Sequence, residues 1–384
     1  MSLDDDARAE LATLESHHRR RIARIVEGGQ GPIIKLDGVD VINLSSNDYL
    51  ALAADKRLSR AGQKATEECG SGAGASRLIS GTQRLHVALE AAVADWLQVR
   101  GVRLFNSGYA ANTGILSTLL RAGDEVFSDE LNHASIIDGC RLSRAHVTVY
   151  PHGDVATLAE QLARASGAGR KIVVTESLFS MDGDIVDIAA LSALCTKSGA
   201  SLIVDEAHAI GAIGPEGRGV CASVGVVPDV LIGTFGKALG TFGAFAATSE
   251  AIAELLWNRA RSFVFSTALP PSVPASTLVA LEIVRSGEGD DRRAMLAALA
   301  RRFRASVTRA GGARESAIAP VLVGDDREVM RQTQRLLGDG VFVQGIRPPT
   351  VPEGTARLRV SLSAGHTIGQ LDKALTAIDH ALRP

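Results

Sequence analysis

The central part of this chain alternates between short apolar runs and stretches of helical character, and this alternation limits the folds open to it. Seven runs rich in β-branched or apolar residues predict strands at Val102–Phe105, Glu125–Phe127, Val147–Tyr150, Ile172–Thr175, Leu202–Val204, Val230–Thr234 and Gly243–Thr248. Intervening segments such as Ala110–Leu120 and Ile188–Ser198 have the character of helices. Strands and helices in this order predict an α/β fold with a large, mostly parallel sheet covered on both faces.

The two ends of the chain have other patterns. Leu3–Glu27 is expected to form a helix ending at Gly28-Gly29, and Asp37-Gly38 predicts a hairpin between Ile33–Leu36 and Val39–Leu44. The C-terminal part predicts helices over Ser272–Ser286, Arg292–Ala310 and Ile368–Leu382, with strands at Ala317–Leu322, Val341–Gln344 and Arg357–Ser361. We therefore expect an N-terminal helix and hairpin (residues 1–45), a large α/β domain (46–285) and a small α+β domain (286–384).

Composition excludes several classes of protein. Of 384 residues 46% are hydrophobic and 22% are charged, which allows a sizeable core, and a net charge of -2 gives no field that would attract nucleic acid or an anionic membrane. The four cysteines form no C-x-x-C pair, so we expect neither a metal site nor a disulfide framework. The acidic start lacks the order of a signal peptide, and no apolar run has the length of a membrane span, so we expect a cytoplasmic protein.

Lys237 is the strongest chemical signal. It lies in Thr234–Gly240, among glycines and apolar residues directly after a predicted strand. Ligands of open parallel sheets bind beyond the carboxyl ends of the strands. A poorly solvated lysine favours its neutral amine, which is the form that makes a Schiff base with a carbonyl group. The alternative is a structural lysine that extends from a turn into solvent.

Asp205 ends another predicted strand, and His208 follows three residues later. A carboxylate at the floor of a crevice needs a cation or several donors nearby. A protonated pyridine nitrogen would be such a partner, and His208 could then donate to an oxygen on the same ring. A metal-binding pair or a helix-capping aspartate are the alternatives.

Two turns and one loop complete the candidate site. Asn106–Asn112 joins a strand to a helix through a glycine, which suits a phosphate, although it could be a simple turn capped by Ser107. His133 could stack on an aromatic cofactor or merely cap the next helix. The glycine-rich loop Gly70–Ser76 follows no apolar strand, so it is no dinucleotide site, which disfavours an NAD-dependent oxidoreductase. We expect it to be a close-approach loop near the active site.

The order of these motifs resembles that of the α-oxoamine synthases, enzymes of fold type I that use pyridoxal 5'-phosphate (PLP). The resemblance extends from Arg21 to the last helix and rests on Ser45–Leu50, Asn106–Asn112, Asn132–Ser135, Ser180–Asp184, Asp205–His208, Thr234–Gly240 and Phe265–Thr267. Arg347–Pro352 and Gly354–Arg359 resemble more narrowly the member that serves biotin biosynthesis. One departure is Ala209, where many relatives carry glycine.

This resemblance implies a role for each candidate residue. Lys237 would carry the cofactor and move the proton at the substrate Cα, Asp205 would pair with the ring nitrogen, and His133 would stack on the ring. The remaining cofactor contacts would come from Gly108, Tyr109, Ser180, Thr234 and His208, with Ser266 and Thr267 reaching a phosphate across a homodimer interface. Arg347 would bind the amino-acid carboxylate, and Arg21, Asn47 and Thr350 would contact substrate.

The implied function is that of a PLP-dependent acyltransferase. It would condense L-alanine with a pimeloyl thioester and release carbon dioxide and a thiol, and the thioester carrier, coenzyme A or acyl carrier protein, stays open. Glycine C-acetyltransferase, 5-aminolevulinate synthase and serine palmitoyltransferase are alternatives with the same chemistry. A PLP-holding interaction protein without turnover is the alternative outside enzymes.

Overall fold

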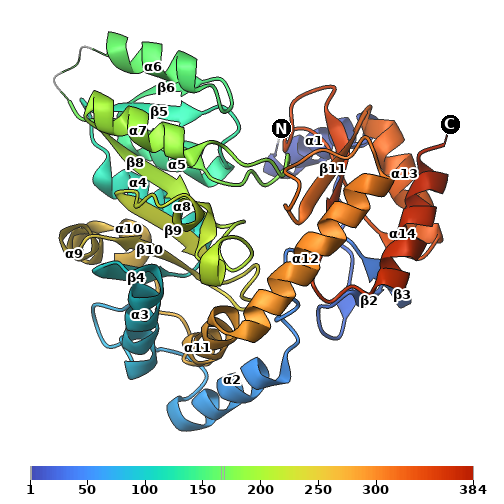
Figure 1. Ribbon diagram of the computed structural model, residues 1–384, viewed down its shortest axis with the longest axis horizontal. Helices are drawn as coiled ribbons and strands as arrows, with labels where there is room; N and C mark the ends of the chain where they lie inside the picture. The colour runs from blue at the N-terminus through green and yellow to red at the C-terminus, as the bar shows by residue number, and fades with distance from the viewer. Residues whose placement is uncertain (1, 166, 168, 384) are drawn as a thin grey trace. The chain divides into compact units, whose positions relative to one another are not determined.

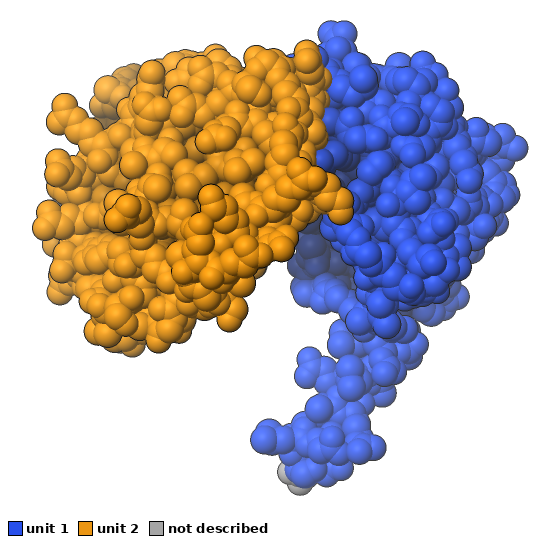
Figure 2. Space-filling model, turned by 90° about the horizontal axis from the view of Figure 1, so that it is seen from below, with its two compact units in different colours: residues 1–51, 181–184, 294–384 blue, residues 52–180, 185–293 orange. Residues whose placement is uncertain are grey.

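The computed structural model describes residues 2–165, 167 and 169–383. The chain divides into two compact units, shown in different colours in Figure 2. Residues 52–180 and 185–293 form what we call the sheet unit, and residues 1–51, 181–184 and 294–384 form the terminal unit. The division into 1–45, 46–285 and 286–384 stays a prediction about domains.

The sheet unit contains a seven-stranded sheet (Figure 1). Its strands, in spatial order, are β4 (Gly101–Phe105), β10 (Ala244–Thr248), β9 (Val230–Thr234), β8 (Ala200–Asp205), β7 (Lys171–Glu176), β5 (Glu125–Asp129) and β6 (His146–Tyr150). Only β10 runs antiparallel to its neighbours β4 and β9, so β4 points the same way as the other strands. The predicted mostly parallel sheet is confirmed, with all seven expected strands present.

Helices bury both faces of this sheet. The helices of the sheet unit are α2 (Lys56–Cys69), α3 (Arg84–Leu97), α4 (Gly108–Leu119), α5 (Ala134–Ser143), α6 (Val155–Arg164), α7 (Ile188–Ser198), α8 (Gly219–Ser223), α9 (Glu250–Arg259), α10 (Arg261–Val264) and α11 (Ser272–Arg285), and α2 packs on α11. One core cluster joins α4 and α5 to the strands through residues such as Ile115, Ile136 and Ile203. Val173 and Val204, which point to the opposite face, are also fully buried. Burial on both faces explains why these strands read as continuous apolar runs.

The terminal unit combines two small sheets with helices. The first sheet has the order β1 (Val26–Glu27), β2 (Ile33–Leu36), β3 (Val39–Asn43), β12 (Val341–Phe342), and the second has β11 (Ile318–Gly324), β14 (Ala356–Ser361), β13 (Gln344–Ile346). Its helices are α1 (Leu3–Ser16), α13 (Asp326–Gly338) and α14 (Ile368–Ala381), while α12 (Gly287–Ser306) begins in the sheet unit. The parallel pairing of β12 with β3 joins the two ends of the chain in one sheet. None of the described helices is both long and apolar enough to span a membrane.

The predicted hairpin is confirmed, but the first helix is shorter than expected. Asp37 and Gly38 have φ values of 51° and 85°, the left-handed conformation that a tight hairpin turn requires. The prediction of a helix over Leu3–Glu27 was wrong, because α1 ends at Ser16 and His18 has φ 57°. Arg19 then forms ion pairs with Asp326 at 2.7 Å and with Glu353, which hold the chain out of the helical path.

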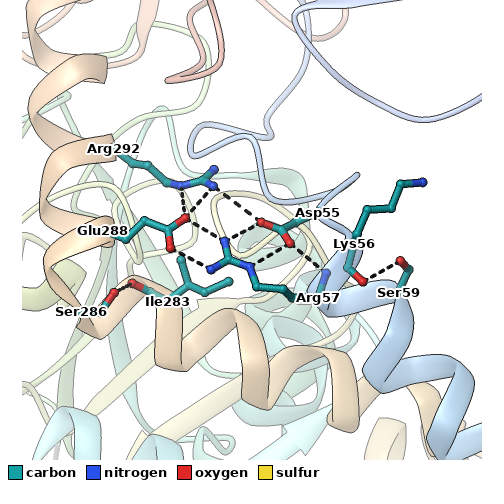
Figure 3. Close-up of polar contacts among 8 residues, drawn as sticks. All are labelled: Asp55, Lys56, Arg57, Ser59, Ile283, Ser286, Glu288 and Arg292. Atoms are coloured by element: carbon teal, nitrogen blue, oxygen red, sulfur yellow. Dashed lines mark hydrogen bonds and ion pairs between the residues drawn. The ribbon is translucent and has the colours of Figure 1, made fainter.

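Charged side chains hold the start of α2 to the start of α12 (Figure 3). Asp55 caps α2 by accepting the Arg57 backbone N–H at 2.9 Å, and its carboxylate also pairs with the Arg57 guanidinium at 2.7 Å. Arg57 binds both oxygens of Glu288, at 2.7 and 2.8 Å, and Arg292 pairs with Glu288 at 2.8 Å. Hydrogen bonds from Arg57 are the main reason that the pKa values of Asp55 and Glu288 fall to about 2.

Candidate active site

Polar residues end four neighbouring strands at one edge of the large sheet. The strands β5, β7, β8 and β9 run parallel and end at Asp129, Glu176, Asp205 and Thr234. Glu176 pairs in register with Asp205, so these two carboxyl groups come from adjacent positions of the same edge. The sheet therefore gathers acidic and hydroxyl side chains at its carboxyl end, where open parallel sheets bind ligands.

Asp205 is buried with two hydrogen-bond donors fixed on its carboxylate. Its Oδ2 accepts from the Asn112 side-chain amide at 2.7 Å, and its Oδ1 accepts from the Ala207 backbone N–H at 2.8 Å. His208, in the turn after β8, is buried as well. The two donors offset part of the cost of burying a carboxylate and fix its orientation.

His133 caps helix α5, as the structural alternative foresaw. Its Nδ1 accepts the Ser135 backbone N–H at 3.2 Å and lies 2.7 Å from the Ser135 hydroxyl. Burial lowers the pKa of His133; the charge of Asp205 opposes this shift, and the charge of Lys237 adds to it. The imidazole is therefore neutral at pH 7, which leaves its ring suited to stacking on an aromatic group.

Glu176 is a residue of this cluster that the sequence analysis missed. It is 3% exposed, and its Oε1 accepts the His133 backbone N–H at 2.7 Å. Burial raises its pKa well above the ordinary value; Asp205 raises it further, while Lys237 opposes the shift. Glu176 directly follows the predicted strand Ile172–Thr175, so the rule that identified Asp205 could have found it.

Lys237 follows β9 in a turn that is fixed by Thr234. The Thr234 hydroxyl donates to the Gly243 carbonyl at 2.9 Å and accepts the Gly236 N–H at 3.2 Å. Lys237 is half-buried, and its charge acts on both His133 and Glu176. The lysine therefore belongs to the same cluster as the buried acids, and a fully solvated surface position is excluded.

The turn after β4 leads into the N-terminus of α4, where backbone N–H groups are accessible to a ligand. Ser107 caps α4 through the Ala110 N–H at 3.1 Å, and Gly108 and Tyr109 are its first two residues. The first N–H groups of a helix lack intrahelical acceptors. A Cβ atom added at Gly108 would meet nothing within 4 Å, so a phosphate could approach this turn.

The segment with Ser266 and Thr267 lies against the same turn in this chain. The Asn106 side-chain amide donates to the Thr267 carbonyl at 3.0 Å, and Thr267 also forms an isolated bridge with Ser76. Thr267 is exposed and Ser266 half-buried. The glycine-rich loop Gly70–Ser76 therefore ends beside this segment.

A PLP molecule fits the residues of the sheet unit. An anchored carboxylate (Asp205) suits a pyridinium nitrogen, a neutral imidazole (His133) suits a ring face, and the α4 terminus suits a phosphate. Ser180 is buried too, four residues beyond the end of β7. The structure thus brings the predicted cofactor residues into one unit.

The predicted substrate residues lie in the terminal unit. Arg21, Arg347 and Thr350 line one cavity of about 440 Å³, together with Arg20, Ile22, Arg24, Met330 and Ile346. Arg21 donates to the Thr350 hydroxyl at 3.1 Å, and Arg347 donates to the His18 carbonyl at 2.6 Å. Burial lowers the pKa of Arg347, and the positive charge of the nearby Arg21 lowers it further. Asp37 also lines this cavity and pairs with Arg24 at 3.0 Å, so the lining carries more arginines than acids and is partly apolar.

Asn47 is not among the residues that line this cavity. Its side-chain oxygen accepts from both terminal nitrogens of Arg359 at 3.2 Å and from the Tyr49 hydroxyl at 3.2 Å. Arg359 is 6% exposed. Arg359 is therefore a further buried arginine of the terminal unit, besides Arg347 and Arg357, and its sequence motif alone does not identify it as a site residue.

Known proteins resemble this chain over nearly its whole length. The family model described as aminotransferase class I and II matches residues 39–378. An 8-amino-7-oxononanoate synthase of Geobacter sulfurreducens is 49% identical over 374 residues, which cover 96% of each chain. A serine palmitoyltransferase structure from S. paucimobilis, with bound PLP–myriocin aldimine, matches with a TM-score of 0.93 at 34% identity and covers 98% of this chain and 96% of that chain.

A second solved structure carries the same name as the sequence relative. The 8-amino-7-oxononanoate synthase of Francisella tularensis matches with a TM-score of 0.76 at 29% identity and covers 88% of this chain and 97% of that chain. These matches confirm the fold type I architecture and the family inferred from the motifs. The chain belongs to the aminotransferase class I and II family and, within it, groups with the 8-amino-7-oxononanoate synthases.

Proposed function

We propose that the chain condenses L-alanine with a pimeloyl thioester, using PLP, and produces 8-amino-7-oxononanoate, carbon dioxide and a free thiol. The observation that carries this proposal is the buried, doubly anchored Asp205 carboxylate at the end of β8, next to the strand whose following turn bears Lys237. The 49% identity to an 8-amino-7-oxononanoate synthase over 96% of the chain supports the choice of reaction.

The residues of the sheet unit would hold the cofactor. Lys237 would bind it covalently through its amine, and the Asp205 carboxylate would keep the ring nitrogen protonated. Gly108, Tyr109 and Thr234 would lie along the cofactor, with Thr234 near its phosphate. His133 would stack on the ring, while Ser180 and His208 would contact the ring oxygen. When bound, PLP supplies an electron-accepting ring for the pair left at the amino-acid Cα.

The protein groups would then bind, orient and move protons. The Arg347 guanidinium would bind the alanine carboxylate through paired hydrogen bonds, and the Lys237 amine would take the proton from Cα. Cα forms a bond to the thioester carbonyl carbon, and the carbon–sulfur bond breaks to release the thiolate. The original carboxylate leaves as carbon dioxide, and Lys237 returns a proton to the same carbon.

The lining of the cavity in the terminal unit favours an acyl substrate that ends in a carboxylate. A pimeloyl chain ends in a carboxylate, and Arg20 and Arg21 supply guanidinium groups that pair with carboxylates, whereas Arg24 already pairs with Asp37. Ile22 and Met330 provide apolar contacts for methylene groups. An acetyl or palmitoyl group has no terminal charge to match these arginines. Arg21, Asn47 and Thr350 stay our proposed substrate contacts.

The assembly and location follow from the same proposal. Ser266 and Thr267 would contact the cofactor phosphate of a second copy, so we propose a homodimer. We further propose that the enzyme acts in the cytoplasm on small-molecule substrates, and that the acyl group arrives on coenzyme A or on an acyl carrier protein.

A product survey tests the proposed reaction. The PLP-loaded protein is incubated with L-alanine, glycine or L-serine, each paired with pimeloyl-, acetyl- or palmitoyl-CoA, and thiol release is measured and products are weighed by mass spectrometry. We expect turnover with L-alanine and pimeloyl-CoA. Glycine with acetyl-CoA or L-serine with palmitoyl-CoA as the best pair would replace the proposed substrates. Bound PLP without turnover in any pair, with the acyl groups offered both on coenzyme A and on acyl carrier protein, would favour an interaction protein.

A further inference from the structure

Asn112 connects elements of the candidate site that lie far apart in sequence. It belongs to α4, is 1% exposed, and its amide nitrogen donates to Asp205 Oδ2 at 2.7 Å and to the Ser135 hydroxyl at 2.9 Å. An amide nitrogen carries two hydrogens, so both are used. The Asn112 Oδ1 is buried without a hydrogen-bond partner among the described residues. The contacts of this side chain are therefore made through its N–H donors.

Ser135 continues the connection to His133. Its hydroxyl oxygen accepts from Asn112, which leaves the hydroxyl proton to donate to His133 Nδ1 at 2.7 Å. The Ser135 backbone N–H donates to the same nitrogen at 3.2 Å. A ring nitrogen that accepts from an N–H carries no proton itself, so the His133 proton lies on Nε2. Both donors share the single lone pair of Nδ1, and together they limit rotation of the imidazole.

The other groups around these residues do not replace Asn112. The backbone of Ala207 holds only Oδ1 of Asp205, and Glu176 holds only the backbone N–H of His133. The charges of Asp205 and Lys237 act on His133 in opposite directions. Among the hydrogen bonds of the described residues, Asn112 thus supplies a side-chain donor to Asp205 Oδ2 and, through Ser135, a link to the His133 ring.

We propose that Asn112 is a positioning residue. It would orient the Asp205 carboxylate toward the nitrogen of the cofactor ring and the His133 imidazole toward the face of the same ring. This inference rests on the proposed use of PLP. Loss of the amide would remove this donor to Asp205 Oδ2 and the donor to Ser135 in a single step. Loss of the Ser135 hydroxyl would keep the bond between Asn112 and Asp205 but loosen the His133 ring.

The test compares Asn112→Ala and Ser135→Ala with the unaltered protein. PLP is titrated into each apoprotein, and the pH at which the absorbance of the bound cofactor changes is recorded. We expect PLP to bind about 10- to 100-fold more weakly to Asn112→Ala, with a shifted pH midpoint, because a hydrogen bond to a charged group is lost. Ser135→Ala should show the smaller change in both measurements. Unaltered affinity and midpoint in a folded Asn112→Ala variant would overturn the proposal.

A second measurement needs no variant. The ring-carbon NMR shifts of His133 in the unaltered apoprotein report which nitrogen carries the proton, and we expect the Nε2–H form at pH 7. A proton on Nδ1, or a charged ring at that pH, would overturn the proposal even if Asn112→Ala fails to fold. Failure of the unaltered protein to bind any PLP would instead contradict the proposed function, so the two failures are distinguishable.

Discussion

The sheet unit and the terminal unit build their candidate sites in different ways. In the sheet unit, Asn112, Ser135, Glu176 and Asp205 are buried and are bonded to one another or to the backbone beside them. In the terminal unit, the cavity is lined by long arginine side chains, of which Arg21 is exposed. Bond-breaking chemistry needs fixed groups, whereas recognition of a charged substrate tolerates adjustable ones. We therefore expect changes in the sheet unit to lower kcat and changes in the terminal unit to raise KM.

The largest effect is expected for Lys237→Ala. Without the amine, covalent attachment of PLP and proton transfer at Cα are both lost, so kcat should fall on the order of 10⁴-fold or more. Borohydride reduction of the PLP-loaded protein should label Lys237 in the unaltered chain and leave the variant unlabelled. The melting temperature of the apoprotein serves as the control for folding. Normal turnover by the variant would contradict the assignment.

Asp205→Asn should produce the next largest loss. The amide has nearly the same shape but cannot keep a ring nitrogen protonated, so we expect kcat to fall on the order of 10²- to 10³-fold. The KM for L-alanine should change much less, because the proposed carboxylate contact is Arg347. If Asp205→Asn raised the KM for L-alanine and kept its kcat, this would contradict the assignment of catalysis to the sheet unit and of substrate binding to the terminal unit.

Arg347→Lys should act mainly on substrate affinity. A lysine keeps the charge but cannot form paired hydrogen bonds, so the KM for L-alanine should rise roughly tenfold or more with a smaller change in kcat. Arg359→Lys is the matched variant, because Arg359 is also buried but contacts Asn47. If only Arg359→Lys raised the KM for alanine, the carboxylate contact would move from Arg347 to Arg359.

The smallest effect is expected for Asp55→Asn, outside both sites. Asparagine still caps α2, so only the ion pairs with Arg57 and Arg292 are lost, and they contribute little at a partly exposed position. We expect the melting temperature at pH 7 to fall by about 1–3 °C. High salt should reduce this difference.

The pH dependence of this variant follows from the pKa of Asp55. The folded-state pKa of about 2 lies below the ordinary 3.8, so the stabilisation is complete above that ordinary value. It is lost as the pH falls from 3.8 toward 2. The difference in melting temperature between the unaltered protein and Asp55→Asn should therefore be constant from pH 7 to 5 and shrink below pH 4. A difference that grew with acidification would contradict the ion-pair assignment.

The sequence predicted the large sheet well because the strands of that sheet are buried on both faces. Continuous β-branched runs such as Val230–Thr234 have few competing interpretations when polar turns bound them. The end of α1 was predicted wrongly because the ion pairs of Arg19 with Asp326 and Glu353 join residues more than 300 positions apart. No local pattern contains that information.

The candidate site was predictable only in part for the same reason. Lys237 and Asp205 each follow a recognisable strand, so local sequence points to them. The contacts of Asn112 and Glu176 depend on which elements are neighbours in the folded sheet. That order departs from the order along the chain, because β10 lies between β4 and β9 and β5 lies between β7 and β6. Ser135 lies beside His133 in sequence, but its link to Asp205 passes through a helix that begins at Gly108.

The measurement that tests the central claim most directly is an absorbance titration of the PLP-loaded protein with L-alanine, followed by addition of pimeloyl-CoA. The account predicts a saturable change in the cofactor spectrum with L-alanine alone. Addition of the thioester should then release thiol and carbon dioxide in equal amounts. A protein without cofactor absorbance, or a spectrum that L-alanine leaves unchanged, would contradict it.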